Sequence, residues 1–166
     1  MDLYLIRHAI AEESSPTGRD ADRALTSEGK AKMRRCAAGL RAIDVRLDLI
    51  LTSPYRRAVE TTEIVAAALG GVETHVLQEL SAGGDMAALL AALRPYRQVQ
   101  SLALVGHQPD LGLLASQLMS GSPSSCPLPF KKGGVACVEI PLPRGPLRGE
   151  LAWFVTPKQL RALSRE

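Results

Sequence analysis

The sequence contains few aromatic residues and few cysteines. Two Phe and one Trp occur among 166 residues, so the core must be mostly aliphatic. The cysteines, Cys36, Cys126 and Cys137, are odd in number and form no Cys-x-x-Cys pair. This pattern indicates neither a disulfide framework nor a zinc site, and we interpret the three side chains as packing residues.

Long apolar runs are also missing. No stretch approaches the roughly 18 residues that a membrane-spanning helix requires. The segment Met1–Arg7 has an acid at its start and lacks the basic start and longer apolar region of a signal peptide. We therefore expect a cytoplasmic protein without membrane partners.

Neither positive nor negative residues dominate the composition. The formal net charge is +3, from 20 Lys and Arg against 17 Asp and Glu. This excess is too small to indicate a nucleic-acid partner, but it suits an anionic substrate. The length predicts one domain spanning residues 1–166.

Strand-like and helix-like segments alternate along the chain. This alternation predicts an α/β fold, a three-layer α/β/α sandwich around a mainly parallel sheet. Thr26 is a plausible N-cap, and Ser53-Pro54 predicts a second cap followed by proline at the first helical position. We expect the last two strands to be antiparallel neighbours. The expected strands are 3–7, 48–52, 72–77, 101–105, 135–140 and 151–155, and the expected helices begin near residues 27, 54, 85, 109 and 158.

Three polar motifs follow predicted strands. They are Arg7-His8-Ala9, Ser53-Pro54-Tyr55-Arg56-Arg57-Ala58 and Gly106-His107-Gln108-Pro109. Ligands of open α/β sheets bind at the carboxyl ends of the strands, where these motifs would meet.

The residue types in these motifs suit phosphoryl chemistry. Arginine offers a planar fork of donors that matches phosphate oxygens. A neutral histidine can accept a phosphoryl group covalently, and fixed cationic donors stabilise the charge on pentavalent phosphorus. Because no DxD, HExxH or Walker motif supplies a metal site, we expect the arginines to take that role without metal or cofactor.

The motifs together resemble the histidine phosphatase superfamily, which is phosphoglycerate mutase-like. Residues 3–9 resemble its signature, and residues 52–61 and 105–109 resemble its second and third blocks. The short length, with residues 20–26 and 151–157, resembles the SixA-type phosphohistidine phosphatases. The resemblance covers nearly the whole chain.

This resemblance implies a role for each matching residue. His8 would be the nucleophile, Arg7 and Arg57 would bind phosphoryl oxygens, and His107 would stabilise the transition state from the opposite side. Arg56 occupies a variable position of the second block.

Two positions depart from the family pattern. Ala9 stands where the superfamily usually has glycine. The general acid of larger members has its nearest counterpart in Glu79, although the surrounding residues match the acid motif poorly. An acid in the loop of residues 12–22, such as Asp20, is the alternative proton donor.

Structural interpretations of the same residues remain open. His8 and His107 could be satisfied histidines at a strand end and a turn. Arg57 could be an exposed helix residue with Glu60 and Thr61 as local partners. His75 is interpreted as structural or exposed. The pair Lys131-Lys132 most simply lies on the surface, and it could attract an anionic partner.

We therefore expect a phosphohistidine phosphatase that acts on a phosphorylated protein through a covalent phosphoryl-His8 intermediate. A phosphatase for a small phosphomonoester is the enzymatic alternative. A non-catalytic phosphate-binding module is the alternative from a different class, and the presence of His8 speaks against it.

Overall fold

A six-stranded sheet forms the centre of the computed structural model, which describes residues 1–141 and 145–164. The strand order is β3-β2-β4-β1-β5-β6. Strands β1 to β4 and β6 run in one direction, and β5 is antiparallel to both of its neighbours. The mainly parallel sheet and the antiparallel pairing of the last strands are thus confirmed. The bounds are β1 (Asp2–Arg7), β2 (Leu49–Thr52), β3 (Glu73–Val76), β4 (Ser101–Gly106), β5 (Val135–Glu139) and β6 (Glu150–Val155).

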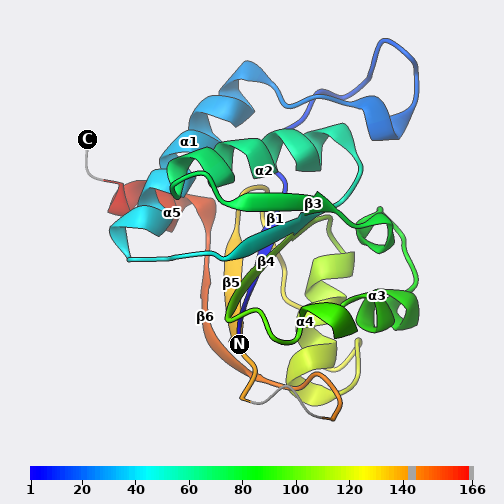
Figure 1. Ribbon diagram of the computed structural model, residues 1–166. Coiled ribbons are helices and arrows are strands. Elements are labelled where there is room, and N and C mark those ends of the chain that lie inside the picture. Colours follow the sequence, from blue (N-terminus) through cyan, green and yellow to red (C-terminus); the bar gives the residue numbers. More distant parts are fainter. Residues whose placement is uncertain (142–144, 165–166) are drawn as a thin grey trace.

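Helices cover both faces of the sheet, as the predicted three-layer sandwich requires (Figure 1). One face carries α1 (Ser27–Ala42), α2 (Arg56–Ala68) and α5 (Pro157–Leu163), and the other carries α3 (Met86–Ala92) and α4 (Asp110–Ser120). Short 3-10 turns are η1 (Asp20–Asp22), η2 (Gln78–Leu80) and η3 (Arg94–Tyr96). Within residues 1–141 and 145–164, no helix has the length and apolar character needed to cross a membrane.

Strand β1 lies between the two hydrophobic layers. Leu3 and Leu5 pack into the cluster beneath α3 and α4, whereas Tyr4 and Ile6 pack into the cluster beneath α1, α2 and α5. Successive side chains of a strand point to opposite faces, so a strand that is buried on both faces needs a continuous apolar run. The uninterrupted sequence from Leu3 to Ile6 meets this requirement.

The two predicted helix caps have different outcomes. The Thr26 hydroxyl accepts a hydrogen bond from the Gly29 amide at 2.9 Å, which confirms Thr26 as the N-cap of α1. The predicted cap at Ser53 is wrong, because α2 begins at Arg56 and Tyr55 occupies the N-cap position. The Ser53 hydroxyl instead turns toward the next strand end, as described below.

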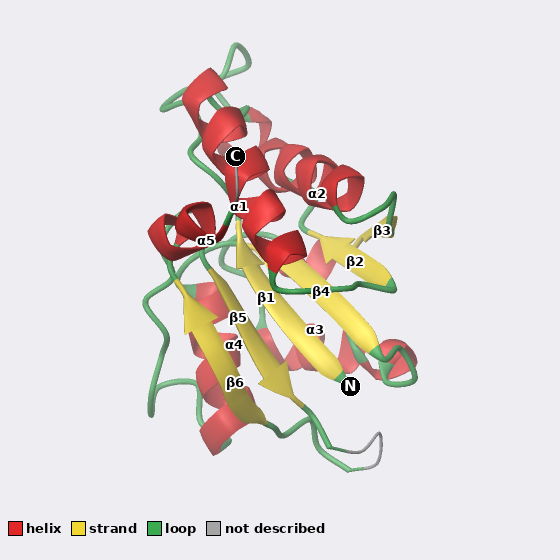
Figure 2. Cartoon of the chain, turned by 90° about the vertical axis from the view of Figure 1, so that its left-hand side faces the viewer, coloured by secondary structure: helices red, strands yellow, loops and turns green. Residues whose placement is uncertain are grey.

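The strand ends that carry the three motifs lie side by side. Strands β2, β4 and β1 are consecutive in the sheet and parallel (Figure 2). Their register aligns Arg7 with Gly106 and Thr52 with Val105. The chain therefore brings the segments after β1, β2 and β4 to one edge of the sheet.

Candidate active site

His8 follows β1 and is held in one orientation by the backbone. Its amide donates to the Gly106 carbonyl at 3.0 Å, which ties it to the end of β4. Its ring Nδ1 lies 2.7 Å from the Ala9 carbonyl oxygen. Because a carbonyl oxygen can only accept, Nδ1 carries the proton and Nε2 carries the lone pair.

The environment keeps the His8 ring neutral. Only 6% of the residue is exposed, and this burial, together with the nearby cationic groups, lowers the pKa of His8 to about 3. The Arg57 Nε donates to His8 Nε2 at 3.2 Å, so the lone pair faces a cation. A neutral imidazole with an oriented lone pair is suited to nucleophilic attack.

Arg57 lies in the first turn of α2 and points into the site. It is 4% exposed, and besides His8 it contacts the carbonyl and carboxylate of Asp20 at 2.8 and 3.0 Å. The neighbouring Arg56 is exposed and bonds Glu60 at 3.2 Å. Adjacent helix residues lie about 100° apart, so only one of the two arginines can face His8. The alternative of an exposed Arg57 is wrong, and Glu60 pairs with Arg56 instead; of the two expected local partners, only Thr61 bonds Arg57, at its carbonyl.

His107 follows β4 and lies beside His8, with ring centroids 5.2 Å apart. Its Nε2 is 2.7 Å from the Ser53 hydroxyl, which also accepts from the Tyr55 amide at 3.3 Å. When the hydroxyl donates its own proton to Nε2, the ring proton of His107 lies on Nδ1, and this tautomer leaves Nδ1 free to donate. Burial, followed by the charge of Arg57, lowers the pKa of His107 to about 4.

Two nitrogen atoms near His8 are buried without a protein partner in the described residues: Arg7 Nε and His107 Nδ1. Arg7 uses its terminal NH1 to donate to the Phe130 carbonyl at 2.6 Å. A buried donor without an acceptor costs about 1–3 kcal/mol, so both nitrogens would gain from donating to a bound anion. The oxygens of a phosphoryl group are acceptors that would satisfy both donors.

The two candidate acids occupy different environments. Burial alone would raise the pKa of Asp20, but hydrogen bonds from Arg23 and Arg57 bring it below the usual value. An ionised Asp20 cannot supply a proton at neutral pH. Glu79 lies in η2, half-buried, on the wall of a cavity of about 140 Å³ that His107 also lines. Of the two acids, Glu79 is therefore the one that shares a cavity with His107.

The remaining polar candidates lie outside this arrangement. His75 is exposed on β3 and lies 2.7 Å from the Glu73 carboxylate. All three cysteines are free, with Cys126 exposed and the other two buried. Across residues 1–141 and 145–164, no group of three or more His, Cys, Asp or Glu side chains is arranged to hold a metal ion.

Sequence reasoning named Thr61 and Ser53 but did not identify how they position the residues of the site. Thr61 accepts from the Ala9 amide at 3.1 Å and donates to the Arg57 carbonyl at 2.6 Å, so it connects two motifs. The Ser53 hydroxyl likewise connects two motifs, because it contacts Nε2 of His107. The spacing of four between Arg57 and Thr61 indicates the contact between these two residues, whereas the bond from the Ala9 amide joins positions far apart in the sequence.

The chain is similar in sequence to known proteins. Residues 3–86 match the sequence model of the histidine phosphatase superfamily, branch 1. Phosphohistidine phosphatase SixA of Escherichia coli K12 is 28% identical over 164 residues, 97% of each chain. An uncharacterized protein of Picosynechococcus sp. is 39% identical over 137 residues, 81% of this chain and 82% of the relative.

A solved structure has the same fold. The protein histidine phosphatase SixA, complexed with tungstate, superposes with a TM-score of 0.85 at 28% identity, covering 96% of this chain and 99% of that chain. The chain therefore belongs to branch 1 of the histidine phosphatase superfamily and is a phosphatase.

Proposed function

We propose that this phosphatase hydrolyses phosphohistidine on a protein through a covalent phosphoryl-His8 intermediate. The observation that carries the proposal is the His8 ring, whose Nδ1 is committed to the Ala9 carbonyl and whose Nε2 lone pair faces Arg57. The similarity to SixA over nearly the full length supports phosphohistidine as the substrate.

In the first step, His8 Nε2 attacks phosphorus. Arg7, Arg57 and His107 donate to the phosphoryl oxygens and stabilise the charge of the pentavalent transition state. The P–N bond to the substrate imidazole breaks, and the leaving imidazole takes the electron pair and a proton from water. The Ala9 carbonyl stabilises the positive charge that develops on the His8 ring.

In the second step, water attacks the phosphoryl-His8 intermediate. The bond between phosphorus and Nε2 breaks, and the electron pair returns to His8. Inorganic phosphate leaves with one proton of the attacking water, and the other proton neutralises the hydroxide left by the first step. The low pKa of His8, about 3, keeps the free ring unprotonated and ready for the next cycle.

The choice of substrate depends on the leaving group. An alkoxide is a poor leaving group, so ester cleavage needs a general acid worth roughly 10²–10⁴-fold in rate. Expulsion of imidazole needs less assistance. Asp20 is ionised, so it cannot supply the proton that an alkoxide needs, and this favours cleavage of a P–N bond.

The test compares kcat/KM of the wild type on a phosphohistidine peptide, the matching phosphoserine peptide and p-nitrophenyl phosphate, with EDTA present throughout. We expect a preference for phosphohistidine of roughly 100-fold or more over phosphoserine, and little change in Glu79→Gln. High turnover of the esters that is lost in Glu79→Gln would instead support the small-phosphomonoester function. Phosphate binding without turnover of any substrate would support a non-catalytic module.

A further inference from the structure

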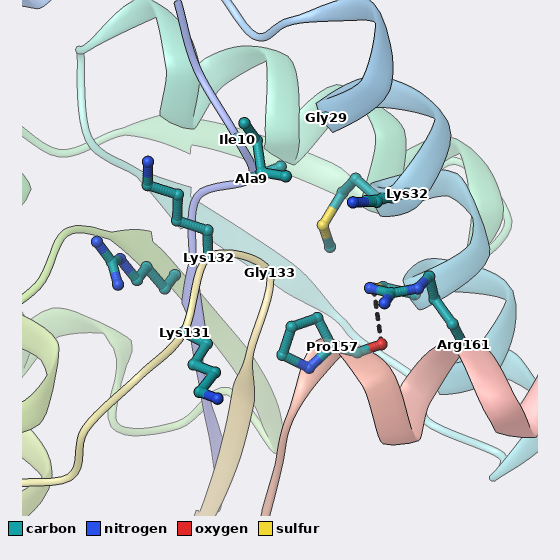
Figure 3. Close-up of a pocket in the computed structure, with 12 residues that line it drawn as sticks. Ala9, Ile10, Gly29, Lys32, Lys131, Lys132, Gly133, Pro157 and Arg161 are labelled. Carbon is teal, nitrogen blue, oxygen red and sulfur yellow. Dashed lines mark hydrogen bonds between the residues drawn. The ribbon is translucent and has the colours of Figure 1, made fainter. Parts of the chain in front are cut away.

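A second cavity, of about 380 Å³, lies at the same sheet edge on the face covered by α1 and α5 (Figure 3). Its walls come from α1, α5, the segment after β1 and the loop before β5. No carboxylate is among its lining residues, which belong to the described part of the chain. Five cationic side chains line it, namely Arg7, Lys32, Lys131, Lys132 and Arg161.

The loop that carries Lys131 and Lys132 is hydrogen-bonded to the end of β1. The Gly133 amide donates to the carbonyl oxygens of Arg7 and His8 at 3.1 and 3.2 Å. The Arg7 amide donates to the Gly134 carbonyl at 3.1 Å. The two lysines are therefore attached to a backbone whose position is fixed relative to His8.

The positive charge around this cavity is only partly compensated. Lys32 forms an ion pair with Glu28 on the exposed side of α1. Lys131, Lys132 and Arg161 form no ion pair with the residues that the structure describes. Figure 3 shows the two lysines on the loop, with side chains that point in opposite directions, and Lys32 and Arg161 on the helices opposite; all four line the cavity. Cations that surround a common space repel one another and attract an anion.

The rest of the cavity wall is apolar. Ile10, Met33 and Pro157 lie between the cationic groups. A fully hydrated inorganic ion would leave these surfaces without contact, whereas an acidic side chain has methylene groups that can pack against them. Arg7 borders both this cavity and His8, so a ligand in the cavity would lie next to the phosphoryl group.

We propose that this cavity is a subsite for an acidic side chain that lies close to the phosphohistidine on the protein substrate. The inference rests on the proposed function, because it assumes that a phosphoprotein occupies the site. The ammonium groups of Lys131 and Lys132 attract the carboxylate, and their flexible stems let it approach along more than one path. The subsite thus selects substrates with acidic residues beside the phosphohistidine.

The experiment measures kcat/KM at low ionic strength, where screening is weak, on three P–N substrates. They are a phosphohistidine peptide with flanking Asp and Glu, the same peptide with Asn and Gln, and phosphoramidate, which has no flanking residues. The variant is Lys131→Ala/Lys132→Ala. The matched control, Arg41→Ala/Arg46→Ala, removes the same charge from exposed residues at a different pocket.

We expect the wild type to prefer the acidic peptide about ten-fold, as for one favourable interaction of roughly 1.4 kcal/mol. Lys131→Ala/Lys132→Ala abolishes this preference and leaves phosphoramidate turnover unchanged, and the control keeps the preference. Equal use of both peptides by the wild type, or a preference that survives in the lysine variant, would overturn the subsite while the phosphohistidine function stands. An equal loss of kcat/KM on all three substrates in the lysine variant would show that the lysines act on the phosphoryl group. That result would also overturn the subsite. Failure of the wild type to hydrolyse any P–N substrate would overturn the function and the subsite together.

Discussion

The two arginines at the start of α2 have the same chemistry and opposite surroundings. Arg57 is buried against His8 and Asp20, whereas Arg56 is exposed and paired with Glu60. Loss of a cationic donor at developing charge costs roughly 10²–10³-fold in kcat. We therefore expect Arg57→Ala to lower kcat/KM by about 100-fold or more, measured on the phosphohistidine peptide.

Arg56→Ala is the matched control for this variant. It removes an exposed pair of the kind that contributes about 0.3–0.5 kcal/mol to stability, so catalysis should change little. The opposite ranking of the two variants would show that the phosphoryl group binds on the other side of α2.

Sequence reasoning identified residues whose chemistry is visible in a motif and missed those whose role depends on geometry. His8 and His107 directly follow strands and Arg57 opens the helix after β2, and the structure brings all three together. Serine is a residue type favoured at N-caps, and nothing in the sequence shows that the Ser53 hydroxyl faces His107 instead. That contact depends on the lateral order of β2 and β4, which local patterns do not encode.

At the scale of elements, the loop before β5 is hydrogen-bonded to the end of β1, where His8 lies. Gly133 has φ of +85°, a left-handed conformation, and its amide bonds the carbonyls of Arg7 and His8. An added Cβ would meet no atom closer than 3.6 Å, so the effect of a substitution comes from the backbone. We expect Gly133→Ala to lower the free energy of unfolding by about 1–2 kcal/mol and also to reduce kcat.

Gly70→Ala is the control that separates the effect on stability from the effect on kcat. Gly70 also has a positive φ, +98°, and nothing lies within 4 Å of its added Cβ, but it lies after α2 and away from His8. Urea denaturation should show a similar loss of stability in both variants, and only Gly133→Ala should lose activity. Full activity in a folded Gly133→Ala protein would show that the loop does not position the site.

At the scale of the whole molecule, the buried histidines couple stability to pH. The pKa values of His8 and His107 are about 3 and about 4 in the folded protein, against about 6.5 when unfolded. Between these values the unfolded chain binds protons that the folded chain does not, so stability falls as pH falls through 6.5.

The free energy of unfolding should therefore be lower at pH 5 than at pH 7.5, by about 2 kcal/mol for each histidine. Urea denaturation at both pH values measures the decline, and this range lies above the unfolded pKa of the carboxylates. His107→Gln removes one of the two titrating histidines and should roughly halve the decline in the free energy of unfolding. Equal stability at both pH values would show that the folded protein accommodates protonated histidines.

The global fold was more predictable than its details. The alternation of strand-like and helix-like segments predicted the layers, and it was clearest for β2 and β4, because strands buried on both faces must be apolar throughout. The strand order β3-β2-β4-β1-β5-β6 was not predicted, because it depends on how the crossover helices pack. The basic cavity was not predicted either, because its cationic residues come from four separate segments of the chain.

The central claim is that His8 accepts the phosphoryl group from phosphohistidine. The most direct measurement mixes the enzyme with a ³²P-phosphohistidine peptide, quenches in alkali within the first turnover, and locates the label by mass spectrometry. The account predicts label on His8 alone, and neither label nor turnover in a folded His8→Ala variant. Label on another residue, or turnover near the wild-type rate in His8→Ala, would contradict it.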